Sequence, residues 1–420
     1  MVPEGWKETT LGTVSKAITS GSRDWAQYYS ERGAKFIRMT NLRRSGIHLD
    51  LSDLKYVAVN SSSGDGKRTQ LRPDDILISI TAELGKIGIV PEGIGEAYIN
   101  QHTALIRIDS AKACPRFVAY LLSSYPMNVQ INRMNDSGAK AGLNLPTLRA
   151  IRLMLPPLLE QEKLDEILSS WDRAIEAVER LIENSECEKR ALMRRLLLGR
   201  DRFAKYQGRP PEFVKLKTLC TVRRGASPRP ISDPKWFAEA GRGWVRISDV
   251  TASQTEHLEA TEQYLSDLGV GKSVAVDPGE LIMSICATIG VPKVVGVPVC
   301  IHDGFVVFRS LDEQLNTSFL YHYLAFYSER LVNSGQPGTQ KNLNTTIVGD
   351  IEFPDISHKE QADIAAVLDT QDREVRVLKE QHFCLVQEKK ALMQQLLTGK
   401  RRVKVDRDVD EIVQGASGHG

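Results

Sequence analysis

Long apolar runs and closely spaced cysteines are both missing from this 420-residue sequence. Without a run of 18 or more apolar residues, neither a transmembrane helix nor a membrane partner is expected. The opening segment Met1–Trp6 has neither the basic nor the apolar part of a secretory signal, so none is expected. The six scattered cysteines form no C-x-x-C pair, which argues against a disulfide framework or a zinc ribbon. Buried thiols in a reducing cytoplasm are therefore predicted.

Catalytic motifs are incomplete or missing as well. Gly269–Ser273 resembles the end of a P-loop, but Ser266 stands where the leading glycine belongs. A turn before a strand is therefore favoured over a nucleotide site, and a phosphate-contacting lysine loop stays an alternative. Pro73-Asp74 with Glu83 and Lys86 has one residue too many for a PD-(D/E)xK nuclease, and no Asn-Pro-Pro-aromatic methyltransferase motif occurs. No catalytic residue and no metal site is predicted.

Net charge is low, at +2 for the whole chain, and does not by itself indicate a nucleic-acid partner. Its distribution is uneven. Residues 1–150 contain 19 Lys and Arg against 14 Asp and Glu, a net charge of +5, whereas residues 201–355 contain 16 against 18, a net charge of −2. If both regions contact DNA, the second must do so through a local basic patch.

The sequence contains an internal duplication. Residues 188–199 recur as residues 388–399 with eight of twelve positions identical. Matching positions here are 200 residues apart, a separation called the offset below. Nearer the start of each half the offset is 208, and between these regions it is 205, so the front part has gained and lost residues while the back part has kept its length. Variable loops on a fixed scaffold behave in this way. The offset of 200 also pairs Leu143-Asn144 with Leu343-Asn344, Glu160-Gln161 with Glu360-Gln361, and Asp172-Arg173 with Asp372-Arg373.

Each half has a front module of about 155 residues, read as mixed α/β, because short β-type runs such as 77–80 and 105–108 alternate with short helical segments at 117–124 and 319–326. A long helical segment follows each module. Apolar residues recur there at spacings of four and three over more than four heptads, with no Pro or Gly inside. Gly199 and Gly399 mark the expected helix ends. The predicted seam residues are Leu164, Leu168, Trp171, Ile175, Val178, Ile182, Leu192, Leu196, Ile364, Leu368, Val375, Leu378, Leu385, Leu392 and Leu396.

Two helices with uncovered seams are expected to bury them against each other. Because a module separates the helices along the chain, an antiparallel pair is the natural closure, with a pseudo-two-fold axis and one module at each end. That geometry suits contact at two places on one extended ligand, such as DNA. We therefore predict an α+β fold in which two mixed α/β modules are separated by two long antiparallel coiled-coil helices. The predicted boundaries are 1–157 and 201–357 for the modules, 158–200 and 358–400 for the helices, and 401–420 for a disordered tail.

Several short pieces recur in a fixed order in the two halves: Pro73–Ser79, Asn100–His102, Gly142–Pro146, Leu155–Gln161, Gly338–Asn344, Phe353–Pro354 and Glu360–Gln361. In this order they resemble the specificity subunits of Type I restriction-modification systems, over roughly residues 5–402. The first half departs from the family at Gly138–Gly142, where a G-T-x-x-like turn is usual. The second half has Cys300–His302 where the first has Asn100–His102.

This resemblance implies a non-catalytic, cytoplasmic, sequence-specific DNA-binding subunit. Each module would be a target-recognition domain that reads one part of a bipartite, asymmetric site in double-stranded DNA. Two modification (methyltransferase) subunits and the restriction (translocase and nuclease) subunits would be its partners. S-adenosylmethionine, ATP and Mg would belong to those subunits, and no cofactor is expected in this chain.

Candidate DNA-contacting residues are basic, amide and hydroxyl side chains in loops, since Arg or Lys reads guanine and Asn or Gln reads adenine. A solvated surface charge is the alternative for each, and a structural salt bridge is the alternative for Arg38 and Arg246. The candidates are Ser20, Ser22, Arg23, Arg38, Asn41, Arg43, Arg44, Lys67, Arg68, Lys140, Arg223, Arg224, Ser227, Arg229, Arg246, Lys272, Gln340, Lys341 and Asn342.

Two alternatives stay open at this point. Lys189 and Lys389 lie on the seam at matching heptads, either extending their ammonium groups to solvent or fixing the register of the helices. For the whole chain, the rival function is a non-catalytic coiled-coil scaffold without DNA specificity, which the low net charge favours. A restriction enzyme with fused catalysis is disfavoured by the missing motifs.

Overall fold

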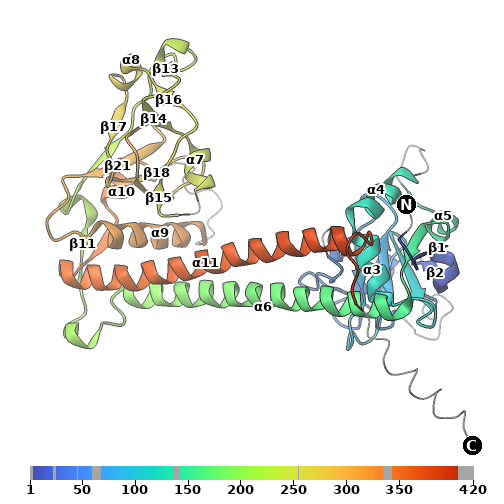
Figure 1. Cartoon of the computed structure of the whole chain (residues 1–420). Helices are drawn as coiled ribbons and strands as arrows, with labels where there is room; N and C mark the ends of the chain where they lie inside the picture. The colour runs from blue at the N-terminus through green and yellow to red at the C-terminus, as the bar shows by residue number, and fades with distance from the viewer. Residues whose placement is uncertain are drawn as a thin grey trace, which may run out of the picture. The chain divides into compact units, whose positions relative to one another are not determined.

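The computed structural model describes residues 3–21, 25–44, 46–58, 68–135, 142–253, 255–333 and 343–404. The chain forms two compact units, one made of residues 1–178 with 381–420 and the other of residues 179–380. The division falls inside the two long helices, α6 (Leu158–Leu196) and α11 (His358–Leu396). Each unit therefore contains one α/β module together with part of α6 and part of α11 (Figure 1).

The module of unit 1 is built on two four-stranded sheets, ordered β2-β9-β6-β7 and β3-β5-β4-β8. Neighbours are antiparallel except β4 and β8, and a separate antiparallel pair joins β1 to β10, just before α6. The strands are β1 Lys7–Thr10, β2 Ser15–Ser20, β3 Tyr29–Ser30, β4 Ala34–Ile37, β5 Lys55–Val57, β6 Ile76–Ser79, β7 Ile87–Ile89, β8 Ala97–Ile99, β9 Thr103–Ile108 and β10 Arg152–Leu155. The helices are α1 Leu11–Val14, α3 Pro115–Ser123, α4 Tyr125–Arg133 and α5 Leu145–Arg149, with short 3-10 turns at Trp25–Tyr28 and Met39–Asn41.

The module of unit 2 repeats this plan with five-stranded sheets, ordered β12-β21-β18-β19-β15 and β13-β16-β14-β20-β17, and with the pair β11-β22 just before α11. The strands are β11 Glu212–Lys215, β12 Thr221–Arg224, β13 Phe237–Ala238, β14 Arg242–Val245, β15 His257–Leu258, β16 Tyr264–Leu265, β17 Val274–Val276, β18 Leu281–Ser284, β19 Pro292–Val295, β20 Val299–Ile301, β21 Phe305–Arg309 and β22 Glu352–Asp355. The helices are α7 Ile247–Ala252, α8 Asp267–Val270, α9 Thr317–Asn333 and α10 Thr345–Gly349, with 3-10 turns at Ala204–Tyr206, Leu216–Thr218 and Pro234–Trp236.

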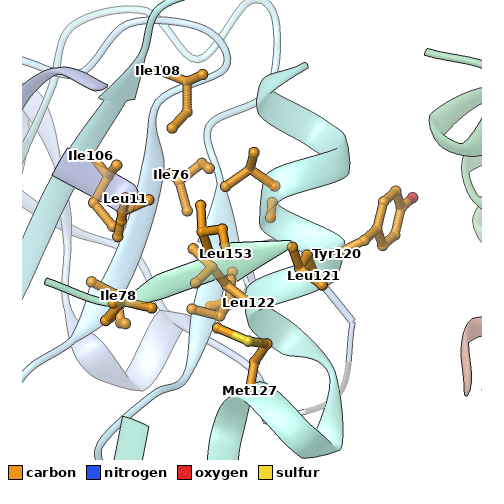
Figure 2. Packing of buried hydrophobic residues seen from close by; sticks show 14 of the residues in the cluster. Leu11, Ile76, Ile78, Ile106, Ile108, Tyr120, Leu121, Leu122, Met127 and Leu153 are labelled. Atoms are coloured by element: carbon orange, nitrogen blue, oxygen red, sulfur yellow. The ribbon is translucent and has the colours of Figure 1, made fainter. Parts of the chain in front are cut away.

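The core of unit 1 joins the module to both helices. Strand β6 is buried at all four positions, as expected for a strand covered on both faces. Ile78 and Leu122 gather in this core, whereas the hydroxyl of Tyr120 points away from the other labelled side chains (Figure 2). Leu164 of α6 and Leu396 of α11 belong to the same apolar cluster. The seam positions predicted from the heptads are all buried or half-buried.

In each unit the two helix segments run antiparallel, and a matched ion pair holds them. Glu160 and Glu360 are only 3% and 1% exposed. Arg402 donates to both carboxylate oxygens of Glu160 at 2.7 Å, and Arg202 donates to those of Glu360 at 2.8 and 2.5 Å. Bidentate pairing of this kind gives geometric specificity as well as energy. The repeated Glu-Gln dipeptide therefore has an architectural role.

The glutamines of that dipeptide fasten each module to its helix. Oε1 of Gln161 accepts from the backbone N–H of Cys114 at 3.0 Å, just before α3, and Oε1 of Gln361 accepts from that of Asn316 at 2.9 Å, just before α9. Asn144 likewise accepts from the backbone of Thr147 to cap α5. The α+β fold, its duplication and its antiparallel helix pair are confirmed.

Three details differ from expectation. Cys187 and Cys384 are exposed, so the prediction of six buried thiols is wrong for two residues, which lie on α6 and α11 outside the seam. Arg402, assigned to a disordered tail, is held by the buried carboxylate of Glu160, while 405–420 lie outside the described residues. Both long helices end three residues before their glycines. Within the described residues, no helix is long and apolar enough to cross a membrane.

Candidate nucleic-acid interface

In each module, a glycine brings two loops into close contact. Gly225 follows β12, and a Cβ added to it would lie 2.2 Å from the carbonyl oxygen of His302 in the loop between β20 and β21. Gly21 follows β2, and a Cβ there would lie 2.1 Å from the carbonyl oxygen of Asn100. Only glycine permits this approach of two backbones. The loop after β12 and the loop after β20 therefore form one surface, with a counterpart in unit 1.

Three of the predicted DNA-contacting residues meet on this surface in unit 2. Arg224 donates from Nε to the carbonyl oxygen of Asp303 at 2.7 Å. Ser227 donates to Oδ1 of the same residue at 2.7 Å, and Arg229 donates to Oδ2 at 3.3 Å. The hydrogen bond from Ser227 and the charge of Arg229 hold the pKa of the Asp303 carboxyl below its ordinary value. Asp303 thus orients two exposed guanidinium groups, which are the groups that bind phosphate and guanine.

The same pair of loops includes His302, whose role is structural. Its Nδ1 accepts from the backbone N–H of Gly304 at 2.9 Å, and its ring packs beside Trp244 and Phe305. Burial lowers the pKa of His302, and the charge of the exposed Arg246 lowers it further. Arg246 therefore adds a third basic group close to these loops.

In unit 1, the candidates Arg38 and Asn41 contribute to the local structure around a short 3-10 turn. Arg38 forms an ion pair with Asp53 at 2.9 Å, in agreement with the salt-bridge alternative. Asn41 is 2% exposed, and its side chain bonds to the backbone of Arg38, Asp50 and Asp53, so it does not belong to the exposed surface. In unit 2, Asp249 accepts from the backbone N–H of Arg246, as Asn41 accepts from that of Arg38 in unit 1. Each of these two matched pairs caps a short helix.

The other described candidates of unit 1 lie on loops. Arg68 donates to the hydroxyl of Thr19 at 2.8 Å and to the carbonyl oxygen of Ser20 at 2.6 Å, which places a guanidinium beside the end of β2. Arg43 pairs with Asp50 at 3.4 Å and stays exposed, as does Arg44. The candidates outside the described residues are Ser22, Arg23, Lys67, Lys140, Gln340, Lys341 and Asn342.

Two further basic residues of unit 2 are exposed. Arg223 lies in β12, and Lys272 lies in the turn between α8 and β17. The segment Gly269–Ser273 thus forms the end of a one-turn helix and a turn before a strand, which favours the turn interpretation over a nucleotide site.

Sequence reasoning missed Asp303, and it named Lys189 and Lys389 as residues that could fix the helix register without naming their partners. Asp303 had no recognisable signal, because its importance depends on two loops that meet only in the fold. Lys389 is buried and forms an ion pair with Asp172, and Lys189 pairs with Asp372. The offset of 200 that matches both lysines and both aspartates was a usable signal for these pairs. For Lys389, an ammonium that reaches solvent is the wrong interpretation.

The contact at Gly225 gives a testable prediction. Gly225→Ala is expected to lower the free energy of unfolding by about 1–3 kcal/mol, because the new methyl group overlaps backbone atoms of His302 and Ile301. Gly208→Ala is the matched control, since nothing lies within 4 Å of its Cβ position and its φ is not positive. Circular dichroism should show a lower Tm for the Gly225 variant alone. Equal Tm values for the two variants would contradict the close contact.

Comparison with known proteins gives a consistent result. The family model described as "Type I restriction modification DNA specificity domain" matches residues 3–184 and again residues 210–382. A putative type I restriction enzyme MjaX specificity subunit from Methanocaldococcus jannaschii is 25% identical over 418 residues, covering 96% of this chain and 95% of that protein. The type I restriction enzyme EcoBI specificity subunit from Escherichia coli is 25% identical over 190 residues, covering 44% of this chain and 39% of that protein.

Solved structures show the same fold. A Type-I restriction-modification system S subunit from M. genitalium aligns with a TM-score of 0.60 and 12% identity, covering 94% of this chain and 99% of that one. A chain from a study of complex assembly in the type I R-M system aligns with a TM-score of 0.59 and 18% identity, covering 96% and 100%. Because the family model matches both halves of the duplicated sequence, this chain belongs to the Type I restriction-modification DNA specificity family.

Proposed function

We propose that this chain directs a Type I modification and restriction complex to a bipartite, asymmetric site in double-stranded DNA, with each module reading one part. The observation that carries this proposal is the matched loop pair at Gly21 and Gly225: in unit 2 it presents basic side chains, and in unit 1 the guanidinium of Arg68 lies beside it. Arg224 and Arg229 have the donors needed for phosphate or guanine. Family membership favours this function over a scaffold without DNA specificity.

The long helices are the proposed docking site for two modification subunits, which restriction subunits then join. Residues 159–199 carry 7 Lys and Arg against 10 Asp and Glu, a balance unsuited to gripping DNA. Exposed apolar side chains, which mark protein contacts when they gather, are present on both helices at Leu159, Leu181, Val377 and Phe383. S-adenosylmethionine, ATP and Mg are assigned to those partners, and this chain is proposed to act in the cytoplasm without catalysing a step.

The decisive experiment is co-expression of this chain with a modification subunit, followed by sequencing of host DNA for methylated adenine. We expect a new motif of two short specified blocks around an unspecified gap. Replacing residues 1–155 with those of another family member should change one block and leave the other. A co-purifying complex that methylates nothing would oppose the proposal, and a chain that purifies alone without salt-dependent affinity for DNA would support the scaffold function.

A further inference from the structure

A histidine and two carboxylates converge in unit 2, away from the loops proposed to contact DNA. Ligand atoms of Glu256, His322 and Asp369 all lie within 4.8 Å of one another. They come from three separate elements: the segment before β15, helix α9 and helix α11. Nε2 of His322 lies 2.6 Å from Oδ1 of Asp369. The three residues thus connect the second module to the C-terminal helix.

The imidazole of His322 is fully buried, with 0% of its side chain exposed, yet among the described residues only one of its nitrogens is hydrogen-bonded. Nδ1 has no hydrogen-bond partner in the part of the chain that the structure describes, and it lies 3.8 Å from Oδ2 of Asp372, one turn along α11 from Asp369. A histidine that ligates a metal through one nitrogen usually directs the N–H of the other toward a carboxylate. In His322, Nε2 faces Asp369 and could ligate an ion, while Nδ1 faces the carboxylate of Asp372.

Unit 1 provides an internal comparison, because the duplication places equivalent residues there. Cys114 and Asn316 are equivalent, because the backbone N–H of each donates to the matched glutamine just before α3 and α9. Six residues further along each helix segment, Tyr120 therefore stands at the position of His322. The offset of 200 puts Ser169 at the position of Asp369. Ile47 stands at the position of Glu256. The backbone carbonyl oxygen of Ile47 accepts from the N–H of Ile89 at 2.7 Å, and at the same place in the sheet of unit 2 the carbonyl oxygen of Glu256 accepts from the N–H of Val294 at 2.9 Å.

None of the three unit 1 equivalents is a histidine or a carboxylate. Ile47 is buried in the apolar core, and Tyr120 donates to Asp172 at 2.5 Å. Arg116 pairs with Asp165 in unit 1, whereas Ser318 and Ala365 stand at those positions in unit 2. Unit 2 therefore has two carboxylates and a histidine that unit 1 lacks at these positions, and it lacks the Arg116–Asp165 ion pair.

Basic groups lie near both carboxylates. Burial lowers the pKa of Lys293 and the charge of Glu256 raises it, which places this ammonium group near Glu256. Among the described residues, neither Glu256 nor Asp369 forms an ion pair with a lysine or arginine; Glu256 pairs with His257 at 2.9 Å, and Asp369 accepts from Ser318 at 3.0 Å. Lys189 pairs with Asp372. A cleft of about 520 Å³ beside these carboxylates is also lined by Arg373, Arg376 and Lys379. Burial raises the pKa of Asp369, but hydrogen bonds from His322 and Ser318 and the charge of Arg373 outweigh burial and lower it.

From this placement we propose that unit 2 binds one divalent transition-metal ion, of the Zn²⁺ class, through Nε2 of His322 and the carboxylates of Asp369 and Glu256. Mixed imidazole and carboxylate ligands favour such ions over Mg²⁺ or Ca²⁺. Metal–ligand bonds of about 2.0–2.2 Å require ligand atoms about 3–3.5 Å apart. Nε2 of His322 and Oδ1 of Asp369 lie 2.6 Å apart and all three ligand atoms lie within 4.8 Å of one another, so side-chain adjustments on this scale would bring them to that spacing. The ion ties the second module to α11.

The test is zinc titration of the full-length chain by isothermal calorimetry, with Co²⁺ absorption as a spectroscopic readout of the ligand set. Cys187→Ser with Cys384→Ser is the starting background, because exposed thiols bind Zn²⁺ by themselves. We expect one ion per chain and a Tm that rises with Zn²⁺. The variants Asp369→Ser and His322→Tyr copy the residues of unit 1, and each should weaken binding by about tenfold or more. His358→Gln, an exposed histidine on α11, should leave binding unchanged.

Two outcomes support or overturn the site. Saturable binding that both unit 1-like substitutions remove, while circular dichroism shows folded protein, supports it. If His322→Tyr does not fold, Asp369→Ser decides, since the Asp369 side chain is partly exposed. The proposal is overturned if Zn²⁺ binds the Asp369→Ser variant as tightly as the starting chain, or if it binds neither of them.

Discussion

Asp172→Asn is expected to lower the free energy of unfolding by about 3–5 kcal/mol, because it leaves the ammonium group of Lys389 buried without a counter-charge. The side chains of Lys389 and Asp172 are only 8% and 10% exposed. Tyr120 donates to the same carboxylate at 2.5 Å, and His48 lies 3.3 Å from it. Urea denaturation followed by circular dichroism measures the effect.

The size of this loss should depend on pH. Burial alone raises the pKa of Asp172, but His48, Lys389 and Tyr120 outweigh it and lower the pKa from 3.8 to about 2. A carboxyl whose pKa is lower in the folded state stabilises the fold above its unfolded pKa, and that stability disappears as the pH falls through the folded value. The difference between the parent chain and Asp172→Asn should therefore be full above about pH 4 and shrink toward pH 2.

Two variants test whether burial is the cause. Asp372→Asn removes the matched pair in unit 2, where the lysine and aspartate are 24% and 37% exposed, and should cost less. Replacing both partners, as Asp172→Leu with Lys389→Met, should recover much of the loss, because no charge is then left unpaired. A loss in Asp372→Asn as large as that in Asp172→Asn would contradict this explanation.

Charge reversal of Arg224 and Arg229 together is expected to abolish methylation of host DNA by the co-expressed complex. Two contacts worth about 1–3 kcal/mol each predict binding weaker by about 30-fold or more. The carboxylate of Asp303 strengthens the effect, since two new glutamates beside it repel DNA phosphates. If both arginines contact phosphates, the slope of log affinity against log salt should fall by about 1.8.

Substitution by lysine separates charge from geometry. Arg224→Lys with Arg229→Lys keeps both charges but loses the planar bidentate donors. It should preserve most affinity while relaxing the methylated motif if these residues read guanine, and should leave the motif unchanged if they bind only phosphate. Arg209→Glu, an exposed arginine between α6 and β11, is the control for net charge. Wild-type methylation by the double glutamate variant would remove these two arginines from the interface.

The long helices, their pairing and the duplication could be predicted from the sequence, because these features depend on local periodicity or on repetition. The heptads of α6 and α11 report one buried stripe, so antiparallel pairing followed from two uncovered seams in one chain. The offset of 200 matches Glu160, Gln161 and Asn144 with Glu360, Gln361 and Asn344, and these residues hold the scaffold in each unit. Family membership rested on the same repeated pieces.

Residue roles in the loops were not readable, because they depend on contacts between segments far apart in the chain. Arg38 and Arg68 are the same residue type, yet one pairs with Asp53 and the other borders the end of β2. Asp303 acquires its role only when the loop after β20 meets the loop after β12. Periodicity and repetition therefore determined the scaffold, whereas the direction and pairing of each polar side chain were decided by folding, because long-range contacts leave no local pattern.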